Sequence, residues 1–272
     1  MTLVDFDGMF DEKITQYVKE SKKKRSSKAW EDIIPKLYKQ FGDTYIAKIK
    51  CTPKEYYAKM STEALVNTLS AHVENGLSVP EFLINELEKR EVVDELLPLL
   101  DVEGTTKYAM NLLGGDPRAF DKYFSILENE GADEELKGEI VTILSEHADE
   151  VKSRILEYYK KKTNEEYALA ILSRVRERDE EVYKALIDGF SSADAWSLAL
   201  RAGYLAAYGD ERALPVLLQK ITDTSIGFVE FQELKYAIEA LGGEYWEERD
   251  FSADKDYIKV EEAKEKSTED NK

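Results

Sequence analysis

The sequence predicts an all-α protein whose central part is an α-solenoid, a row of stacked antiparallel helical hairpins. Glycine and proline are scarce, with 14 and 6 among 272 residues, whereas an all-β chain needs many more turn residues. Apolar residues recur at helical spacing in one segment after another. An acidic residue at a helix boundary returns every 30 to 34 residues, a period typical of stacked helical hairpins. These features favour helices throughout and a repeat in the middle of the chain.

The repeat is defined by a short corner at which one apolar helix ends and the next begins. Gly209 is expected to end one helix, and Asp210 to cap the helix that follows. A hairpin of this kind exposes apolar stripes on both flanks, so neighbouring hairpins must stack to bury them. The spacing therefore predicts a solenoid over residues 61–246. The corner acids are Asp116, Asp149, Asp179, Asp210 and Glu244, separated by 33, 30, 31 and 34 residues.

Residues 1–60 follow a different pattern and are expected to form an N-terminal helical cap or a separate subdomain. Pro35 falls inside one apolar helical pattern, where a kink or an early break is expected. Thr52, Pro53 and Glu55 have the order of an N-cap, a first helical residue and the acid of a capping box, so a helix is expected to start there. The elements expected before it are an irregular arm over residues 1–10 and helices over 11–21, 28–41 and 45–49.

Two segments are expected to lie outside the packed helices. Residues 247–272 are charged and poor in apolar residues, which predicts a disordered or loosely docked tail with at most a short helix from Tyr257 to Lys266. The basic run from Lys22 to Lys28 is interpreted as a solvated linker, with an anion-binding patch as the alternative. No aromatic residue is interleaved with these lysines, which argues against a nucleic-acid site.

The formal net charge of −18 is unevenly distributed along the chain. Residues 1–60 hold 13 Lys and Arg against 9 Asp and Glu, a net charge of +4. Residues 61–272 hold 25 against 47, a net charge of −22. A strongly acidic body repels phosphate backbones, so nucleic acid is disfavoured as its partner.

Cysteine usage and hydropathy predict a cytoplasmic protein that does not bind membranes. Cys51 is the single cysteine, which makes a disulfide framework impossible and suits a reducing compartment. The N-terminus lacks the basic region and apolar run of a signal peptide. No window approaches the roughly 20 apolar residues of a membrane span.

Residue patterns that carry chemistry are scarce. His72 and His147 stand far apart in the sequence, and neither has a second His or Cys at metal-ligand spacing. Phosphate-loop, dinucleotide-binding and nucleophile-elbow motifs are absent from the sequence. We therefore expect no catalytic residue, no metal and no cofactor, and a role other than catalysis, although the sequence leaves enzymatic activity open.

Several corners resemble the junctions of HEAT repeats, especially the short HEAT-like type found in phycobilisome lyases. The segments that carry the resemblance are Leu205–Leu217, Leu112–Phe120 and Ala240–Glu244. The corners at Asp149 and Asp179 keep the acid but lack the glycine. The resemblance covers about residues 61–246 and implies a HEAT-like superhelix. It implies little about activity.

The resemblance also implies where a partner binds. In HEAT-like arrays the second helix of each hairpin usually lines the concave face, and tyrosine and arginine are enriched at the centres of binding surfaces. The alternative is that these side chains are ordinary packing or solvated positions. The candidate binding residues are Tyr167, Arg174, Arg178, Arg201, Tyr204, Tyr208, Lys235 and Tyr236.

We expect the protein to act as a non-catalytic scaffold that binds a protein or peptide on the concave face. Nucleic-acid binding is one alternative, because HEAT-like alkylpurine DNA glycosylases cradle duplex DNA. A lyase for a chromophore or small ligand is another, and a pocket lined by Tyr56, Tyr57, Tyr108 and Tyr167 would favour it. The identity of the partner and the oligomeric state stay open.

Overall fold

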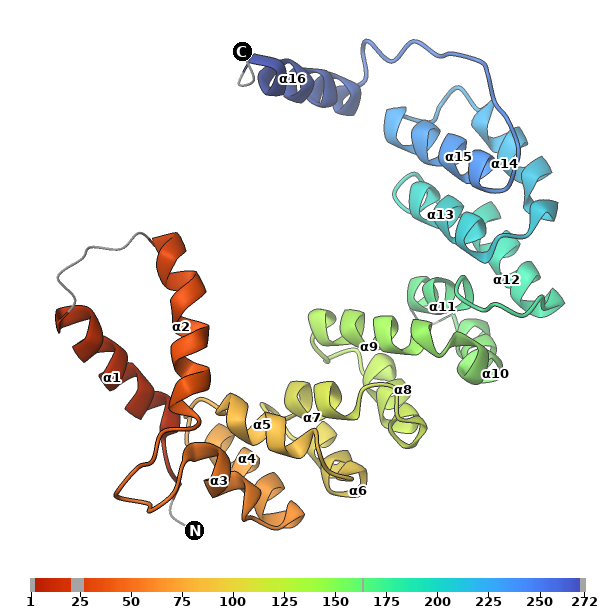
Figure 1. The fold of residues 1–272 in the computed structure, drawn as a ribbon. Coiled ribbons are helices and arrows are strands. Elements are labelled where there is room, and N and C mark those ends of the chain that lie inside the picture. The colour runs from red at the N-terminus through yellow and green to blue at the C-terminus, as the bar shows by residue number, and fades with distance from the viewer. Residues whose placement is uncertain (1–2, 21–26, 163, 270–272) are drawn as a thin grey trace. The chain divides into compact units, whose positions relative to one another are not determined.

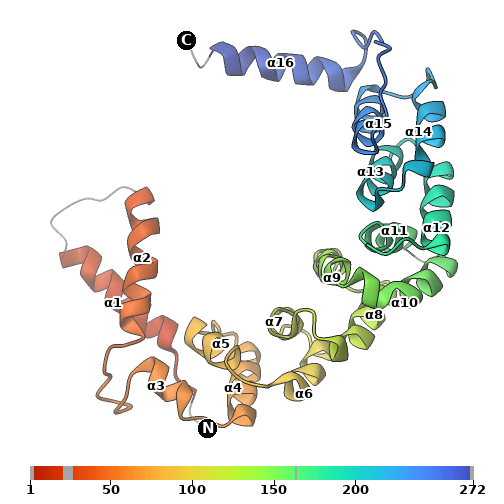
Figure 2. The same cartoon turned by 45° about the vertical axis from the view of Figure 1, so that its right-hand side comes forward.

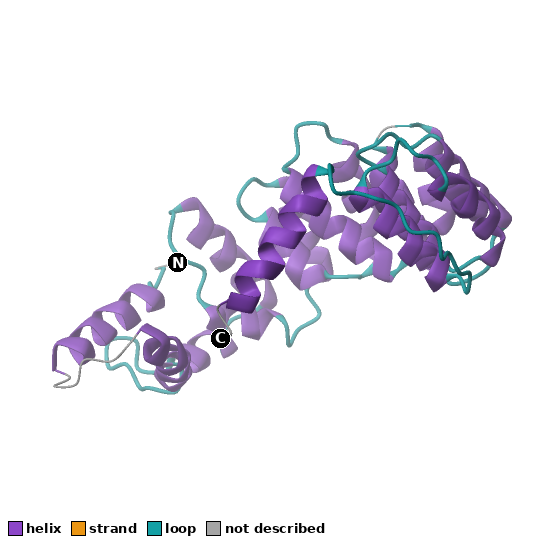
Figure 3. Ribbon diagram, turned by 90° about the horizontal axis from the view of Figure 1, so that it is seen from above, coloured by secondary structure: helices purple, strands orange, loops and turns teal. Residues whose placement is uncertain are grey.

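The computed structural model describes residues 3–20, 27–162 and 164–269 of the chain, and within these residues the fold is all-helical (Figure 1). The described residues form sixteen α-helices and three short 3-10 helices. They form no strand, and Figure 3 accordingly shows helices and loops alone. The prediction of an all-α protein is thus confirmed. No helix in this part of the chain is long and apolar enough to cross a membrane. Residues 21–26, most of the basic run from Lys22 to Lys28, lie outside the described residues.

The chain divides into two compact units, Met1–Ser125 and Ile126–Lys272, with the division falling inside α8 (Phe120–Glu128). The first unit holds α1 (Phe6–Glu20), α2 (Ser27–Phe41), α3 (Pro53–Ala58), α4 (Thr62–Glu74), α5 (Glu81–Leu87), α6 (Val93–Leu96), η1 (Leu97–Asp101), α7 (Thr106–Leu113) and η2 (Pro117–Ala119). The second holds α9 (Glu134–Glu146), α10 (Ala148–Lys160), α11 (Glu165–Leu172), α12 (Glu180–Ser191), α13 (Leu198–Tyr208), η3 (Glu211–Ala213), α14 (Leu214–Ile221), α15 (Phe228–Ala240) and α16 (Lys255–Glu269).

Aromatic packing joins the first three helices to the rest of the first unit. Tyr38 of α2 stacks on Phe82 of α5, with ring centroids 4.6 Å apart and planes 6° apart. Phe6 of α1 meets the edge of Tyr57 of α3 at 5.5 Å, and both side chains are fully buried. Offset and edge-on aromatic pairs of this kind stabilise beyond the area they bury.

Three expectations for residues 1–60 are wrong in detail. The arm expected over residues 1–10 is helical from Phe6, because the Asp5 carboxylate accepts a hydrogen bond from Gly8 N (2.8 Å) and caps the helix start. Helix α2 runs through Pro35 without the expected break. The helix expected over 45–49 is a turn, closed by a hydrogen bond from Ile46 N to Cys51 O (3.0 Å).

The capping box at the start of α3 is confirmed. Thr52 Oγ1 accepts a hydrogen bond from Glu55 N at 3.2 Å, and the Glu55 carboxylate accepts one from Thr52 N at 3.1 Å. These two bonds satisfy backbone donors that the first turn of a helix leaves free.

The helices of the second unit form two layers (Figure 2). In one layer α9, α11, α13 and α15 follow one another side by side, each in contact with the next. The other layer holds α10, α12 and α14, and α10 contacts α12. Successive helices along the chain therefore alternate between the two layers. Residues about 30 apart in sequence lie on adjacent helices of one layer.

Three of the five corner acids cap the helix that follows, as predicted. Asp116 accepts from Arg118 N (3.0 Å), Asp179 from Glu181 N (2.9 Å) and Asp210 from Arg212 N (3.0 Å). Gly209 ends α13 with a left-handed φ of +73°, a conformation that glycine adopts without strain. The local chemistry of capping was therefore readable from the sequence at these positions.

Asp149 and Glu244 do not have the capping role expected of them. Helix α10 begins at Ala148, one residue earlier, and the Asp149 carboxylate instead accepts from Arg176 N (2.9 Å) and Glu177 N (3.3 Å). Glu244 is followed by an irregular segment up to α16. The apolar helical period stops at this point of the sequence, so there is no helix directly after Glu244 to cap.

Part of the tail at 247–272 makes specific contacts within the second unit. Arg249 donates hydrogen bonds to Ile221 O (2.8 Å) and Asp223 O (2.9 Å) at the end of α14. Phe251 packs against Phe228 and Phe231, with centroid distances of 5.4 and 5.1 Å. Tyr257 likewise meets the edge of the Phe228 ring, with centroids 5.2 Å apart. Helix α16 follows, and most of its described side chains are exposed.

Candidate functional site

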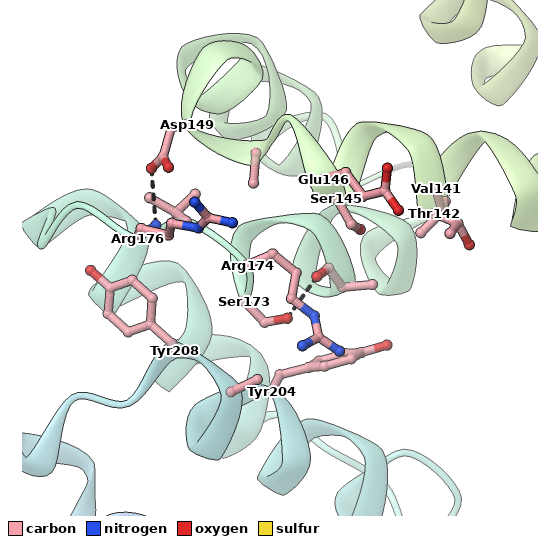
Figure 4. A pocket seen from close by; sticks show the side chains of 14 residues that line it. Val141, Thr142, Ser145, Glu146, Asp149, Ser173, Arg174, Arg176, Tyr204 and Tyr208 are labelled. Atoms are coloured by element: carbon pink, nitrogen blue, oxygen red, sulfur yellow. Dashed lines mark hydrogen bonds between the residues drawn. The ribbon is translucent and has the colours of Figure 1, made fainter. Parts of the chain in front are cut away.

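An open groove of about 750 Å³ lies in the second unit where α9, α11 and α13 adjoin (Figure 4). Its walls come from the C-terminal half of α9, the end of α11 with the corner behind it, and the last turns of α13. The lining residues are Val141, Thr142, Ser145, Glu146, Ala148, Asp149, Ala170, Ser173, Arg174, Val175, Arg176, Tyr204, Ala207 and Tyr208.

The corner after α11 presents two arginines to the groove. Val175 is 3% exposed and anchors the corner in the core, whereas Arg174 and Arg176 on either side of it are exposed. The Asp149 carboxylate fixes the corner by accepting a hydrogen bond from the Arg176 backbone N–H at 2.9 Å. Among the residues that the structure describes, neither guanidinium group donates a hydrogen bond or forms an ion pair. Both cations are therefore available to a ligand.

Tyr204 forms the wall beside Arg174. Figure 4 shows the Arg174 guanidinium lying beside the Tyr204 ring. The ring is half-buried, and burial, followed by the charge of Glu166, raises the pKa of Tyr204 above its ordinary value. A side-chain hydrogen bond with Glu166 raises the pKa further, so the hydroxyl stays protonated at neutral pH and is engaged with Glu166.

Helix α13 turns an uncharged face outward. Leu205 and Tyr208 are buried on its inner side, while its exposed residues are Leu200, Gly203 and Ala207. This spacing places the three exposed residues on one face of the helix. Ala207 lines the groove, whereas Leu200 and Gly203 lie outside its lining, so a ligand that extends from the groove along α13 would meet this uncharged face.

The groove contains residue types that recognise ligands but few of the groups that take part in catalysis. Glu146 and Asp149 balance the two arginines in charge, and the hydroxyl of Ser173 is engaged with Ala170 O (2.6 Å). His72 and His147 do not line the groove: the Nδ1 atom of His72 lies 2.7 Å from Ser78 O, and that of His147 lies 2.9 Å from Glu150. Within the described ranges, no group of three or more His, Cys, Asp or Glu residues is placed to hold a metal ion.

Three of the eight candidate residues, Arg174, Tyr204 and Tyr208, line the groove. Tyr208 is 5% exposed, and its hydroxyl is hydrogen-bonded to the corner at Asp179. The hydroxyl donates to Asp179 O (3.1 Å) and accepts from Asp179 N (2.9 Å). The ring of Tyr208 therefore forms part of the groove wall, whereas its hydroxyl is already hydrogen-bonded to the backbone of Asp179.

Arg178 and Arg201 hold the unit together. Arg178 donates to Tyr208 O (2.7 Å) and Gly209 O at the end of α13. The side chain of Arg201 is 11% exposed and binds Glu166 (3.1 Å), Glu165 (3.4 Å) and Gly189 O (2.7 Å).

The last three candidates lie outside the groove lining. The Tyr167 hydroxyl donates to Glu134, and this hydrogen bond is the first cause that raises the pKa of Tyr167 to about 12. Lys235 and Tyr236 lie on α15, and Tyr236 is 60% exposed.

Sequence reasoning missed Arg176 and Ala207. The signal for Arg176 is the alternation Arg174-Val175-Arg176 directly after a helix end, where a buried residue turns both of its neighbours outward. The signal for Ala207 is its helical spacing from Leu200 and Gly203, a stripe of exposed uncharged residues in a chain that is 35% charged.

Known proteins offer no template for this groove. No protein-family model, no curated protein and no solved structure matches the chain. A role for the groove therefore has to be argued from its own residues, their exposure and their charges.

Proposed function

We propose that this protein is a non-catalytic scaffold, a HEAT-like α-solenoid that binds a protein or peptide partner in the groove of α9, α11 and α13. The observation that carries the proposal is the groove itself. It combines two exposed, unpaired guanidinium groups with the half-buried Tyr204 and the uncharged face of α13. Arginine and tyrosine beside apolar surface are typical of residues that dominate protein interfaces.

The repeat supports the HEAT-like part of the proposal. Helices α9, α11, α13 and α15 follow one another in one layer, and the corners at Asp179 and Asp210 share the same cap. A stack of this kind exposes a continuous surface built from equivalent helices, which is how repeat proteins bind extended partners. The buried, unpaired Cys51 supports a reducing compartment such as the cytoplasm.

The charges of the groove favour a protein over a nucleic acid. Glu146 and Asp149 also line the groove, from the end of α9 and the start of α10, and the Asp149 carboxylate is bonded to the backbone of Arg176. A phosphate backbone would meet both carboxylates, whereas a polypeptide can place side chains of matching charge or no charge against each wall. A chemical reaction on a small ligand would need reactive groups that the groove lining does not supply.

A peptide-display selection tests the proposal. The full-length protein selects binders from a library of random peptides, and each binder is then tested against two charge-reversal variants. Arg174→Glu/Arg176→Glu alters the groove. The control, Lys160→Glu/Lys184→Glu, makes the same change in net charge on exposed residues of α10 and α12 in the other layer.

We expect binders that keep their affinity for the control and lose at least about tenfold on the groove variant, the effect of removing one or two charged contacts. A selection that returns no binder, or only binders that both variants retain, would contradict the proposal.

A further inference from the structure

The arginines of the described chain are almost all engaged with partners of their own. Carboxylates pair with Arg90, Arg118, Arg201 and Arg212, main-chain carbonyls accept from Arg178 and Arg249, and Arg154 has a contact as well. Arg174 and Arg176 are the exceptions within the described ranges, and both line the groove. The chain has 56 acidic residues against 38 basic ones, so carboxylates are in excess. Two guanidinium groups that have no partner among the described residues thus favour carboxylates supplied by a binding partner.

The exposed face of α13 continues the groove with an apolar stripe. Leu200, Gly203 and Ala207 are exposed, and Leu200 is 49% exposed. Just before the helix, Trp196 is 94% exposed. The turn that carries this tryptophan is fixed by Ser197, whose backbone N–H donates to the Asp194 carboxylate at 2.8 Å and whose hydroxyl accepts from Asp194 N at 3.1 Å.

The spacing of this stripe fits a helical partner. From Leu200 to Ala207 within α13 the intervals are 3 and 4 residues, the period of one helix face. A Cβ added at Gly203 would meet no atom within 4 Å, so the surface there is open, and the small side chains let another helix approach closely. Helices docking in grooves use this mode of recognition, with apolar anchors at intervals of three and four residues.

We infer that the partner is an amphipathic helix with Asp or Glu residues along one flank of its apolar stripe. This inference rests on the proposed function of the groove and names the class of its partner. The apolar stripe of the partner lies on Leu200, Gly203 and Ala207. Its carboxylates accept hydrogen bonds from Arg174 and Arg176.

The test follows from the peptides selected by the full-length protein. We expect the peptides that depend on the groove to carry apolar residues at i, i+3 or i+4, and i+7, with Asp or Glu on one flank. Circular dichroism should show that they gain helix on binding. Replacing the flanking Glu residues of the best peptide by Gln should weaken binding to the wild-type protein about tenfold, the loss of one charge-assisted pair.

A double-mutant cycle then assigns that loss to the groove. The same Glu-to-Gln change should have little effect on binding to the Arg174→Gln/Arg176→Gln protein, because the partner charges are already gone. Groove-dependent peptides that bind equally well without their carboxylates, or that bind as extended chains, would overturn the inference and leave the binding function standing. A selection that returns no groove-dependent peptide would instead contradict the proposed function.

Discussion

Most arginines of the second unit bind partners within that unit, whereas the two arginines of the groove, Arg174 and Arg176, have no partner among the described residues. Arg212 binds Asp210 and Glu180, and Arg178 binds two carbonyl oxygens at the end of α13. Arg174 lies only four residues before Arg178, yet its guanidinium is free. Arginine thus stabilises the fold at one set of positions and is available to bind a partner at another. Mutations should separate the two roles, because stability would change in the first case and binding in the second.

The largest effect on stability is expected for Arg201→Ala. This change leaves the carboxylates of Glu165 and Glu166, which are 29% and 35% exposed, without their cation. Removing one partner of a buried pair costs 3–5 kcal/mol, and partial exposure reduces that to about 2 kcal/mol here. Urea unfolding followed by circular dichroism measures the change. A loss below about 0.5 kcal/mol would show that Arg201 is not a structural residue.

A smaller loss, about 1 kcal/mol at pH 7, is expected for Asp210→Ala, because the helix beyond the corner loses its cap. A hydrogen bond from Arg212 lowers the pKa of Asp210. A carboxylate whose pKa is lower in the folded state stabilises the fold at pH values above its unfolded-state pKa, which is near 3.9. That stabilisation is lost as the pH falls through the folded-state pKa. The difference between wild type and variant should therefore shrink below pH 4. If wild type and variant differ by the same free energy of unfolding in urea at pH 7 and pH 3, the charge of Asp210 contributes nothing to stability.

The groove variant Arg174→Glu/Arg176→Glu should unfold within about 0.5 kcal/mol of wild type, because neither guanidinium group has a partner to lose. It should still lose groove-dependent peptides. Paired urea titrations and fluorescence-anisotropy titrations measure the two quantities on the same sample. Destabilisation comparable to that of Arg201→Ala would remove the distinction between the arginines that bind partners within the unit and the two groove arginines.

A stability change of opposite sign is expected at Gly203. In Gly203→Ala the added methyl group meets open space and helix propensity improves, so stability should rise by about 0.5–1 kcal/mol. In Gly203→Leu the larger side chain should instead block the approach of a helix and abolish peptide binding. Unimpaired binding by Gly203→Leu would show that the partner does not pass over this face of α13.

Local chemistry explains what the sequence could predict. A capping box such as Thr52 to Glu55, or a corner such as Gly209-Asp210, involves neighbours in the sequence, so its residues are visible together. Asp149 shows the limit, because the backbone donors that its carboxylate satisfies lie 27 and 28 residues further on. The turn over residues 45–49 was predicted as a helix for a different reason, because its apolar residues fit a short helix equally well.

The candidate site was predictable as a set of residue types and helix faces but not in its roles. Arg174 and Arg201 are alike in the sequence, and only the fold brings Glu165 and Glu166 beside Arg201. Tyr167 was expected on the binding surface, and the fold gives it Glu134 as a partner, 33 residues away. Pairing over such separations depends on how the hairpins stack, which no local pattern records.

Hydrogen–deuterium exchange of the full-length protein, with and without the best selected peptide, tests the central claim most directly. Binding in the groove should slow exchange at the C-terminal half of α9, at the first turn of α10, at residues 170–176 and along α13, and leave α12 and the rest of α10 unchanged. Protection confined to α12 and the C-terminal part of α10, or to the first unit, would place the binding surface elsewhere and contradict the account.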